Sequence, residues 1–251
     1  MRGVPDSFTD ALVMGERPTI DIRRAREQHA AYVQFLGDNG YGVMMVATDE
    51  AYPDCPFVED VAVVLETIAV QTRPGAQARR GEVGAVAEAL AALRPLRRII
   101  APGTVDGGDV IRLADTVYVG LSQRTNREGI DQLAEFAAED GLRTVPIAVR
   151  GVLHLKSAVA RLDDETLLLA PDCVDEGMFD GYRIIEKDPA ESHLASVLAL
   201  ANGAMAMTTT APRTLGFLHD AGYQPTLLDS SEFQAVDGGL TCLSVLIEPL
   251  G

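Results

Sequence analysis

The sequence has little of three things that mark particular classes of protein: cysteine, positive charge and long hydrophobic runs. Its three cysteines fit neither a disulfide framework nor a zinc site, so we expect reduced thiols and no metal centre. Basic residues number 21 against 37 acidic ones, and the formal charge of −16 disfavours nucleic acid and anionic membrane surfaces as partners. No stretch is long enough to span a membrane, and residues 1–20 lack the apolar core of a secretory signal. These absences predict a cytoplasmic protein.

The composition that is present predicts a globular chain. With 251 residues, 47% of them hydrophobic, the sequence can bury one substantial core. We therefore expect a single domain over residues 1–251. The net negative charge of the chain favours a cationic small molecule as a ligand over an anionic partner.

A pattern of two short strands, a helix and a further strand recurs along the chain. The first copy runs from the paired strands of 58–75 through a helix in 79–95 to a strand at 97–101. Similar paired strands open at 107–126, 154–171 and 200–210, and residues 238–249 are predicted to add an apolar strand that closes the set with the N-terminus. The copies begin near residues that recur every 40 to 50 positions, roughly, as in radial repeats: Asp60, Asp109, His154, Asn202 and Cys242. Either a closed ring of five such units or an ordinary α/β sheet explains the spacing.

Chemically capable side chains occupy equivalent places in these copies. Asp60, Asp106, His154 and Cys242 all fall at or just before the first strand of a copy. Taken alone, Cys242 fits a buried core cysteine, His154 a core histidine and Asp106 a turn residue. In a ring, however, equivalent positions converge on the axis. A thiol nucleophile, an imidazole and two carboxylates would then surround one cavity, and a planar guanidinium is the cation that matches paired carboxylates.

Several segments in this order resemble the dimethylarginine dimethylaminohydrolases of the guanidino-modifying superfamily. They are "YPDCPFVEDVAVV", "TRPGAQARRGE", "DGGDV", "LSQRTN", "HLKSAVARLDDETLLL" and "GGLTCLSVLIE", and the similarity runs from about residue 20 to residue 248. The resemblance implies a five-bladed, pseudo-fivefold α/β propeller of ββαβ units with its site on the axis. It also implies hydrolysis of asymmetric dimethylarginine and monomethylarginine to citrulline and an amine, with no metal or organic cofactor.

The resemblance further implies roles for individual residues. Cys242 matches the nucleophile, His154 the general acid and base, and Asp106 the supporting acid, while Asp60 and Glu59 match the guanidinium contacts. Because neighbouring strand residues point to opposite faces, the assignment of Glu59 is weaker than that of Asp60. Six more positions match contacts to the rest of the substrate: a pocket wall at Phe57, carboxylate ligands at Arg79 and Arg124, an amino-group ligand at Asp54, and backbone contacts at Leu12 and Val236. Leu12 lies in a lid region, which departs most from the family.

Two alternative functions remain open from the sequence. Arginine deiminases share the "GGD" segment but place an acidic residue two positions after the histidine, where this chain has Lys156. That difference favours an N-methylated substrate, which donates fewer hydrogen bonds. A non-enzymatic alternative is a ribosome-binding factor with the same propeller, which fits poorly with the net charge. The expected partner is a small methylated arginine, and the expected assembly is a monomer or a homodimer.

Overall fold

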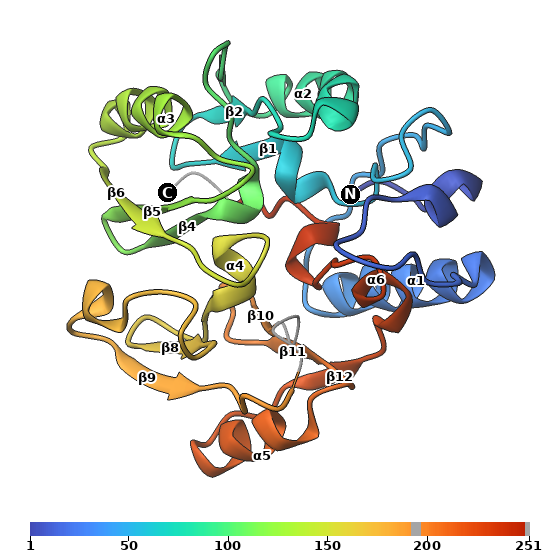
Figure 1. Ribbon diagram of the computed structural model, residues 1–251, viewed down its shortest axis with the longest axis vertical. Helices are drawn as coiled ribbons and strands as arrows, with labels where there is room; N and C mark the ends of the chain where they lie inside the picture. The colour runs from blue at the N-terminus through green and yellow to red at the C-terminus, as the bar shows by residue number, and fades with distance from the viewer. Residues whose placement is uncertain (192–196, 249–251) are drawn as a thin grey trace.

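Four three-stranded sheets stand around a common centre (Figure 1). The computed structural model describes residues 1–191 and 197–248. In each sheet the first two strands are antiparallel and the third pairs in parallel with the second. The sheets are β1 (Ala62–Val64), β2 (Ala69–Gln71) and β3 (Leu96–Arg98); β4 (Val110–Leu113), β5 (Thr116–Leu121) and β6 (Arg143–Ala148); β7 (Val159–Arg161), β8 (Thr166–Leu169) and β9 (Arg183–Glu186); β10 (Val197–Ala199), β11 (Met205–Thr208) and β12 (Thr226–Leu228).

A helix joins the second strand to the third in three of these sheets. They are α2 (Val83–Ala91), α3 (Arg127–Glu139) and α5 (Pro212–Asp220), which lie on the outside of the ring in Figure 1. The third sheet has only a short 3-10 helix at Glu176–Phe179 in this place. The predicted ββαβ unit is therefore confirmed, with a reduced helix in its third copy.

Local sequence explains where these elements begin and turn. Ala114 adopts a positive φ of 51° in the two-residue turn between β4 and β5, at the predicted position. The side chain of Asn126 caps α3 by accepting a hydrogen bond from the backbone N–H of Gly129. One predicted boundary is wrong: Asn202 lies in the turn between β10 and β11, so the fourth unit already includes β10 from Val197 and does not start near Asn202.

The fifth sector of the ring is built differently. It contains α1 (Ile22–Asp38), α6 (Ser231–Gln234) and the N-terminal segment (Figure 1). The strand predicted within 238–249 is wrong for the described residues, because Thr241–Leu243 forms a 3-10 helix and 244–248 pair with no strand. Glu248 nevertheless accepts hydrogen bonds from Tyr41 and Arg94, each at 2.7 Å, so the C-terminal segment lies between the N-terminal part of the chain and the first unit. Side-chain and backbone contacts, not a sheet, close this sector.

Hydrophobic clusters lie between neighbouring sheets, not only within them. One cluster joins the first sheet to the second and includes Val70, Val117 and Leu133. Others join the second sheet to the third, the third to the fourth, and the fourth to α1. Each unit thus buries its apolar faces only when its neighbours are present, which is the packing expected of a radial repeat.

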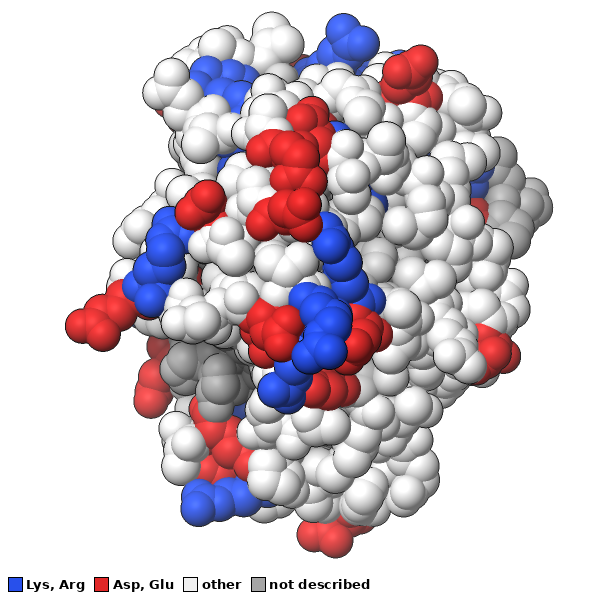
Figure 2. Space-filling view, turned by 90° about the vertical axis from the view of Figure 1, so that its right-hand side faces the viewer, with Lys and Arg blue, Asp and Glu red and all other residues white. Residues whose placement is uncertain are grey.

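The distribution of charged side chains over the described part of the surface in Figure 2 shows no basic region that would contradict the acidic composition. Figure 2 shows the side of the ring that lies to the right in Figure 1, where acidic and basic side chains are interspersed and no continuous basic surface is visible among the described residues. Within the described ranges, no helix has the length and apolar character needed to cross a bilayer.

Candidate active site

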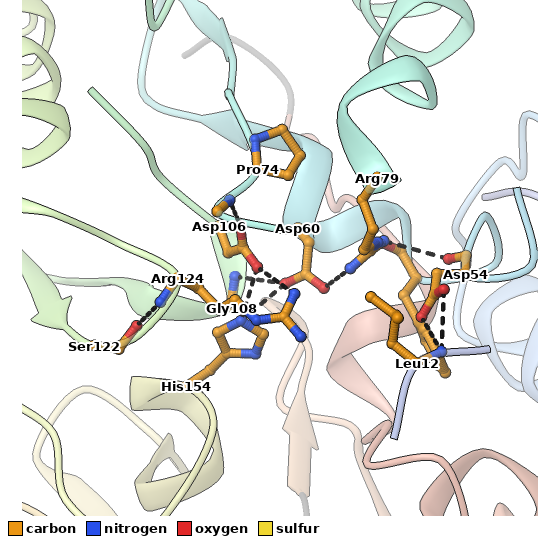
Figure 3. A network of polar contacts seen from close by, with 12 residues as sticks. Leu12, Asp54, Asp60, Pro74, Arg79, Asp106, Gly108, Ser122, Arg124 and His154 are labelled. Atoms are coloured by element: carbon orange, nitrogen blue, oxygen red, sulfur yellow. Dashed lines mark hydrogen bonds and ion pairs between the residues drawn. The ribbon is translucent and has the colours of Figure 1, made fainter. Parts of the chain in front are cut away.

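The four residues predicted to converge come from four different parts of the ring. Asp60 lies in the 3-10 helix Val58–Val61 before β1, and Asp106 directly precedes the 3-10 helix before β4. His154 is the N-cap residue of α4 (Leu155–Ala158), which leads into β7, and Cys242 lies in the last 3-10 helix. Figure 3 shows Asp60, Asp106 and His154 pointing toward one another at the centre.

His154 lies between two buried carboxylates. Its Nε2 is 3.1 Å from Asp106 Oδ2, in hydrogen-bond distance, and 3.9 Å from Asp60 Oδ1. Burial alone would lower the pKa of His154, but Asp60 and the hydrogen bond to Asp106 outweigh burial and raise it to about 9. At neutral pH the imidazole is therefore protonated and can act as a proton donor.

Asp60 is held on both oxygens. Oδ1 accepts a hydrogen bond of 3.1 Å from the backbone N–H of Gly108, and Oδ2 pairs with Arg79. Burial alone would raise the pKa of Asp60, yet the charges of His154 and Arg79 outweigh that effect and lower it. The carboxylate is consequently ionised and fixed in direction.

The two glycines of the "DGGD" segment allow this close approach. A Cβ atom at Gly107 would lie 2.0 Å from the backbone oxygen of Glu59. At Gly108 it would lie 2.8 Å from Asp60 Oδ1 and 2.9 Å from the ring of His154. Any side chain at either position would push the first unit or the histidine out of place.

Cys242 presents its thiol to the same centre. Its Sγ accepts a hydrogen bond of 3.4 Å from the backbone N–H of Gly239. Burial raises the pKa of the Cys242 thiol, and the negative charges of Glu59 and Asp60 raise it further. The thiol is therefore neutral in the free protein, and a cation placed beside it would favour the thiolate.

Glu59 faces the site together with Asp60, because residues 58–61 form a 3-10 helix rather than the strand on which the weaker assignment rested. Its Oε1 accepts a hydrogen bond of 2.6 Å from Lys156 Nζ. Its Oε2 is buried without a hydrogen-bond partner among the described residues. A buried carboxylate oxygen with no partner is a ready acceptor for a ligand N–H group.

The outer part of the site lies under the N-terminal segment. Both carboxylate oxygens of Asp54 are 3.2 Å from the backbone nitrogen of Leu12. Figure 3 draws these two contacts. Burial raises the pKa of Asp54. Asp237 accepts a hydrogen bond of 2.5 Å from the backbone N–H of Met14. Residues 12–14 are thus held over the site by two carboxylates. Sequence reasoning missed Asp237, whose only signal was its place between Val236 and two glycines.

The two arginines predicted to bind a substrate carboxylate have different surroundings. Arg124 is partly exposed, and its Nη1 lies 3.7 Å from Asp106 Oδ2. Arg79 is buried, where it pairs with Asp60 and Glu82 and donates to the backbone oxygens of Asp54 and Phe57. Arg79 therefore orients Asp60 in this conformation, while Arg124 has the freer guanidinium.

Two small hollows meet at Cys242 and His154. The inner hollow has a volume of about 10 Å³, and its wall includes Glu59 and Lys156. The outer hollow has a volume of about 30 Å³. Apart from Glu59, all the residues predicted to contact the substrate lie in the wall of the outer hollow. These volumes leave room for about one and about two water molecules. An amino acid can enter only if the segment around Leu12 moves away.

Asp60, Asp106 and His154 could also surround a metal ion, since one ligand atom from each lies within 4.8 Å of the others. The same oxygens already contact His154, Arg79 and Arg124. Three cationic groups against these carboxylates oppose a divalent ion more strongly than a singly charged group, because the repulsion grows with the charge of the ligand. The donor set therefore suits a guanidinium better than a divalent metal.

Comparisons with known proteins agree with this arrangement. A family model described as arginine deiminase matches residues 92–209. The N(G),N(G)-dimethylarginine dimethylaminohydrolases of Streptomyces coelicolor and Pseudomonas aeruginosa are 40% and 35% identical to this chain, over 94% and 95% of it and 90% and 94% of their own lengths.

Solved structures extend the comparison to the fold. A cysteine-to-serine mutant of the Pseudomonas aeruginosa enzyme, in complex with citrulline, superposes with a TM-score of 0.91 at 34% identity, covering 96% of this chain and 95% of that one. A cyanobacterial arginine dihydrolase domain, 16% identical, has the same fold with a TM-score of 0.87 over 98% of this chain and 96% of its own. The pseudo-fivefold α/β propeller is therefore confirmed. The chain belongs to the dimethylarginine dimethylaminohydrolase family.

Proposed function

We propose that this protein hydrolyses Nω,Nω-dimethylarginine and Nω-methylarginine to citrulline and dimethylamine or methylamine. The observation that carries the proposal is that Cys242 and His154 line the same two hollows, with Glu59 and Asp60 in their walls and Asp106 hydrogen-bonded to His154. Such a pocket favours a cation, and its own thiol becomes reactive only when that cation arrives.

The substrate is held at its two ends. Its carboxylate pairs with Arg124 and, after a side-chain shift, with Arg79, while its ammonium group meets Asp54 and the backbones of Leu12 and Val236. The ring of Phe57 forms a wall beside the alkyl chain. Glu59 Oε2 and the oxygens of Asp60 accept hydrogen bonds from the guanidinium.

Binding of the guanidinium activates the nucleophile. The positive charge offsets Glu59 and Asp60, so the pKa of the Cys242 thiol falls and its proton leaves to solvent. The thiolate then adds to the central guanidinium carbon. His154 donates its proton to the dimethylated nitrogen, the C–N bond breaks, and dimethylamine departs from an S-alkylthiouronium intermediate.

The second half of the reaction uses the same histidine as a base. Neutral His154 takes a proton from a water molecule whose oxygen adds to the thiouronium carbon. The C–S bond breaks, the hydroxyl proton of the adduct passes to the departing thiolate, and citrulline is released with Cys242 restored as a thiol. Asp106 keeps the ring of His154 in place during both steps through its hydrogen bond to Nε2.

Arginine deiminase activity is the alternative, because the matching family model carries that description. Lys156 argues for the methylated substrate. It occupies Oε1 of Glu59 and leaves one oxygen for the ligand. Arginine donates two more hydrogen bonds than dimethylarginine does, so its extra N–H groups would be buried without acceptors.

The test is a direct comparison of dimethylarginine, monomethylarginine and arginine, with citrulline and amine measured in parallel. We expect faster turnover of the methylated substrates, and faster turnover of arginine would reverse the assignment. Cys242→Ser should abolish turnover and leave calorimetric binding measurable. Cys173→Ser is the matched control, because Cys173 is a buried cysteine of the third sheet's cluster.

A further inference from the structure

A larger cavity than the two hollows of the site lies on the ring axis, next to the inner hollow. It has a volume of about 230 Å³ and is lined by the first strand of each of the four sheets and by residues 244–246. Asp60, Asp106 and His154 precede the first strands of three sheets, so β1, β4 and β7 run away from the site along the cavity wall. Figure 1 shows β1, β4 and β10 next to the centre of the ring.

The cavity and the inner hollow of the site share a boundary. Glu59, Lys156 and Thr241 line both spaces. The ion pair between Glu59 Oε1 and Lys156 Nζ, at 2.6 Å, is the polar part of this boundary. The Lys156 side chain is 24% exposed and has a flexible four-carbon stem, so it can move without unfolding the wall.

The proposed binding mode places the guanidinium in the inner hollow next to this boundary, with its N–H groups toward Glu59 and its leaving nitrogen toward His154. The amino-acid end of the substrate lies toward Asp54 and Arg124, under the N-terminal segment, and the guanidinium lies against Glu59 at the inner end. After Cys242 has attacked, the alkyl chain still fills the front of the site, because the thiouronium intermediate is covalently attached. An amine released behind that chain has no free path to the front.

The chemistry of the cavity fits the amine. Dimethylamine leaves as a neutral molecule, since His154 supplies the proton that its nitrogen needs when the C–N bond breaks. The cavity wall is largely aliphatic, with residues such as Val64, Val159 and Ala199. Such a wall accommodates two methyl groups and a neutral nitrogen without desolvating a charge.

We propose that the axial cavity is the exit route of the leaving amine, which passes beside the Glu59–Lys156 pair while the intermediate blocks the front. The inference rests on the proposed function. It assigns the 230 Å³ cavity to small neutral amines. Water then enters through the same route, replaces the departed amine and serves as the reactant of the second step.

The test narrows the cavity without touching the reacting groups. Ala199, at the end of β10, and Val64, at the end of β1, are partly buried residues of the cavity wall. Ala199→Leu and Val64→Phe each narrow it from a different sheet. Ala31→Leu is the matched control, because Ala31 is exposed on α1. For each variant, kcat and KM are measured with dimethylarginine and with monomethylarginine, and the folded state is checked by thermal unfolding.

The expected signature is a dependence on the size of the leaving group. In the narrowed variants, kcat for dimethylarginine should fall about tenfold, with a smaller fall for monomethylarginine and KM nearly unchanged. An unchanged ratio of the kcat for dimethylarginine to that for monomethylarginine, in whichever of the two narrowed variants folds, would overturn the exit route. Failure of the unaltered protein to form citrulline from either substrate would instead overturn the proposed function.

Discussion

Replacing Asp106 by asparagine removes a buried carboxylate whose hydrogen bond and charge both help to raise the pKa of His154. The Nε2–Oδ2 distance is 3.1 Å and Asp106 is fully buried, so water screens this interaction little. The pKa of His154 is raised from 6.5 to about 9 against the opposing effect of burial. That net rise corresponds to about 3 kcal/mol, and it arises because Asp60, Asp106 and Asp109 together outweigh burial. Loss of one carboxylate should lower the pKa by at least about 1.

The sign of the pH effect follows from the direction of this shift. A raised histidine pKa stabilises the folded protein fully below pH 6.5, and the stabilisation is lost as the pH rises through about 9. In Asp106→Asn this stabilisation should be lost at a lower pH, because the pKa of His154 is lower in that variant. Turnover should also fall by about 100-fold, because a weaker hydrogen bond no longer orients the proton donor.

The assay is an NMR titration of the imidazole protons. The chain has four histidines, and the pKa of His29 is lowered by burial to about 4, so its signal titrates well apart from that of His154. The His154 signal is identified by its loss in His154→Gln. A pKa of His154 that does not change in Asp106→Asn would refute the reasoning, since the charge of Asp106 would then contribute nothing.

Three further predictions concern residues around the reacting centre. Arg124→Gln should raise the KM for dimethylarginine by about tenfold with a smaller change in kcat, measured in steady-state assays; an unchanged KM would exclude a substrate contact. Asp109→Ala should lower the free energy of unfolding by about 3 kcal/mol in urea denaturation, because the buried backbone N–H of Leu155 and two hydroxyl donors lose their acceptor. Asp237→Gly should raise KM and increase proteolysis near Met14, because the backbone N–H of Met14 loses its acceptor. Asp237→Asn keeps an acceptor and tolerates the positive φ of 62°, so it should change KM and proteolysis less. Equal effects of the two Asp237 variants would contradict the role of the carboxylate.

The repeat pattern made most of the ring predictable. Paired strands with tight turns, as around Ala114, have a local signal in alternating apolar residues and turn residues. The spacing alone left a closed ring and an ordinary α/β sheet open, and the resemblance to a known family favoured the ring. Only in a ring do the equivalent places of successive units bring Asp60, Asp106 and His154 to one centre.

The fifth sector and the ion pairs were less predictable for physical reasons. Residues 244–248 are apolar enough for a strand, but contacts with Tyr41 and Arg94 hold them without a ladder, and such long-range contacts leave no local pattern. Glu59 was ambiguous because strand geometry separates neighbours that a 3-10 helix brings to the same side. The pair of Arg79 with Glu82 is local, three residues apart, but its burial against Asp60 depends on the tertiary structure.

The central claim is that Cys242 forms a covalent bond to the carbon of a methylated guanidinium. Mass spectrometry of the protein mixed with dimethylarginine and quenched in acid within milliseconds tests it most directly. The account predicts that the peptide containing Cys242 gains the mass of the substrate less dimethylamine, and that Cys242→Ser gains nothing. Steady citrulline production with an unmodified Cys242 peptide at every quench time, or an adduct on another residue, would contradict it.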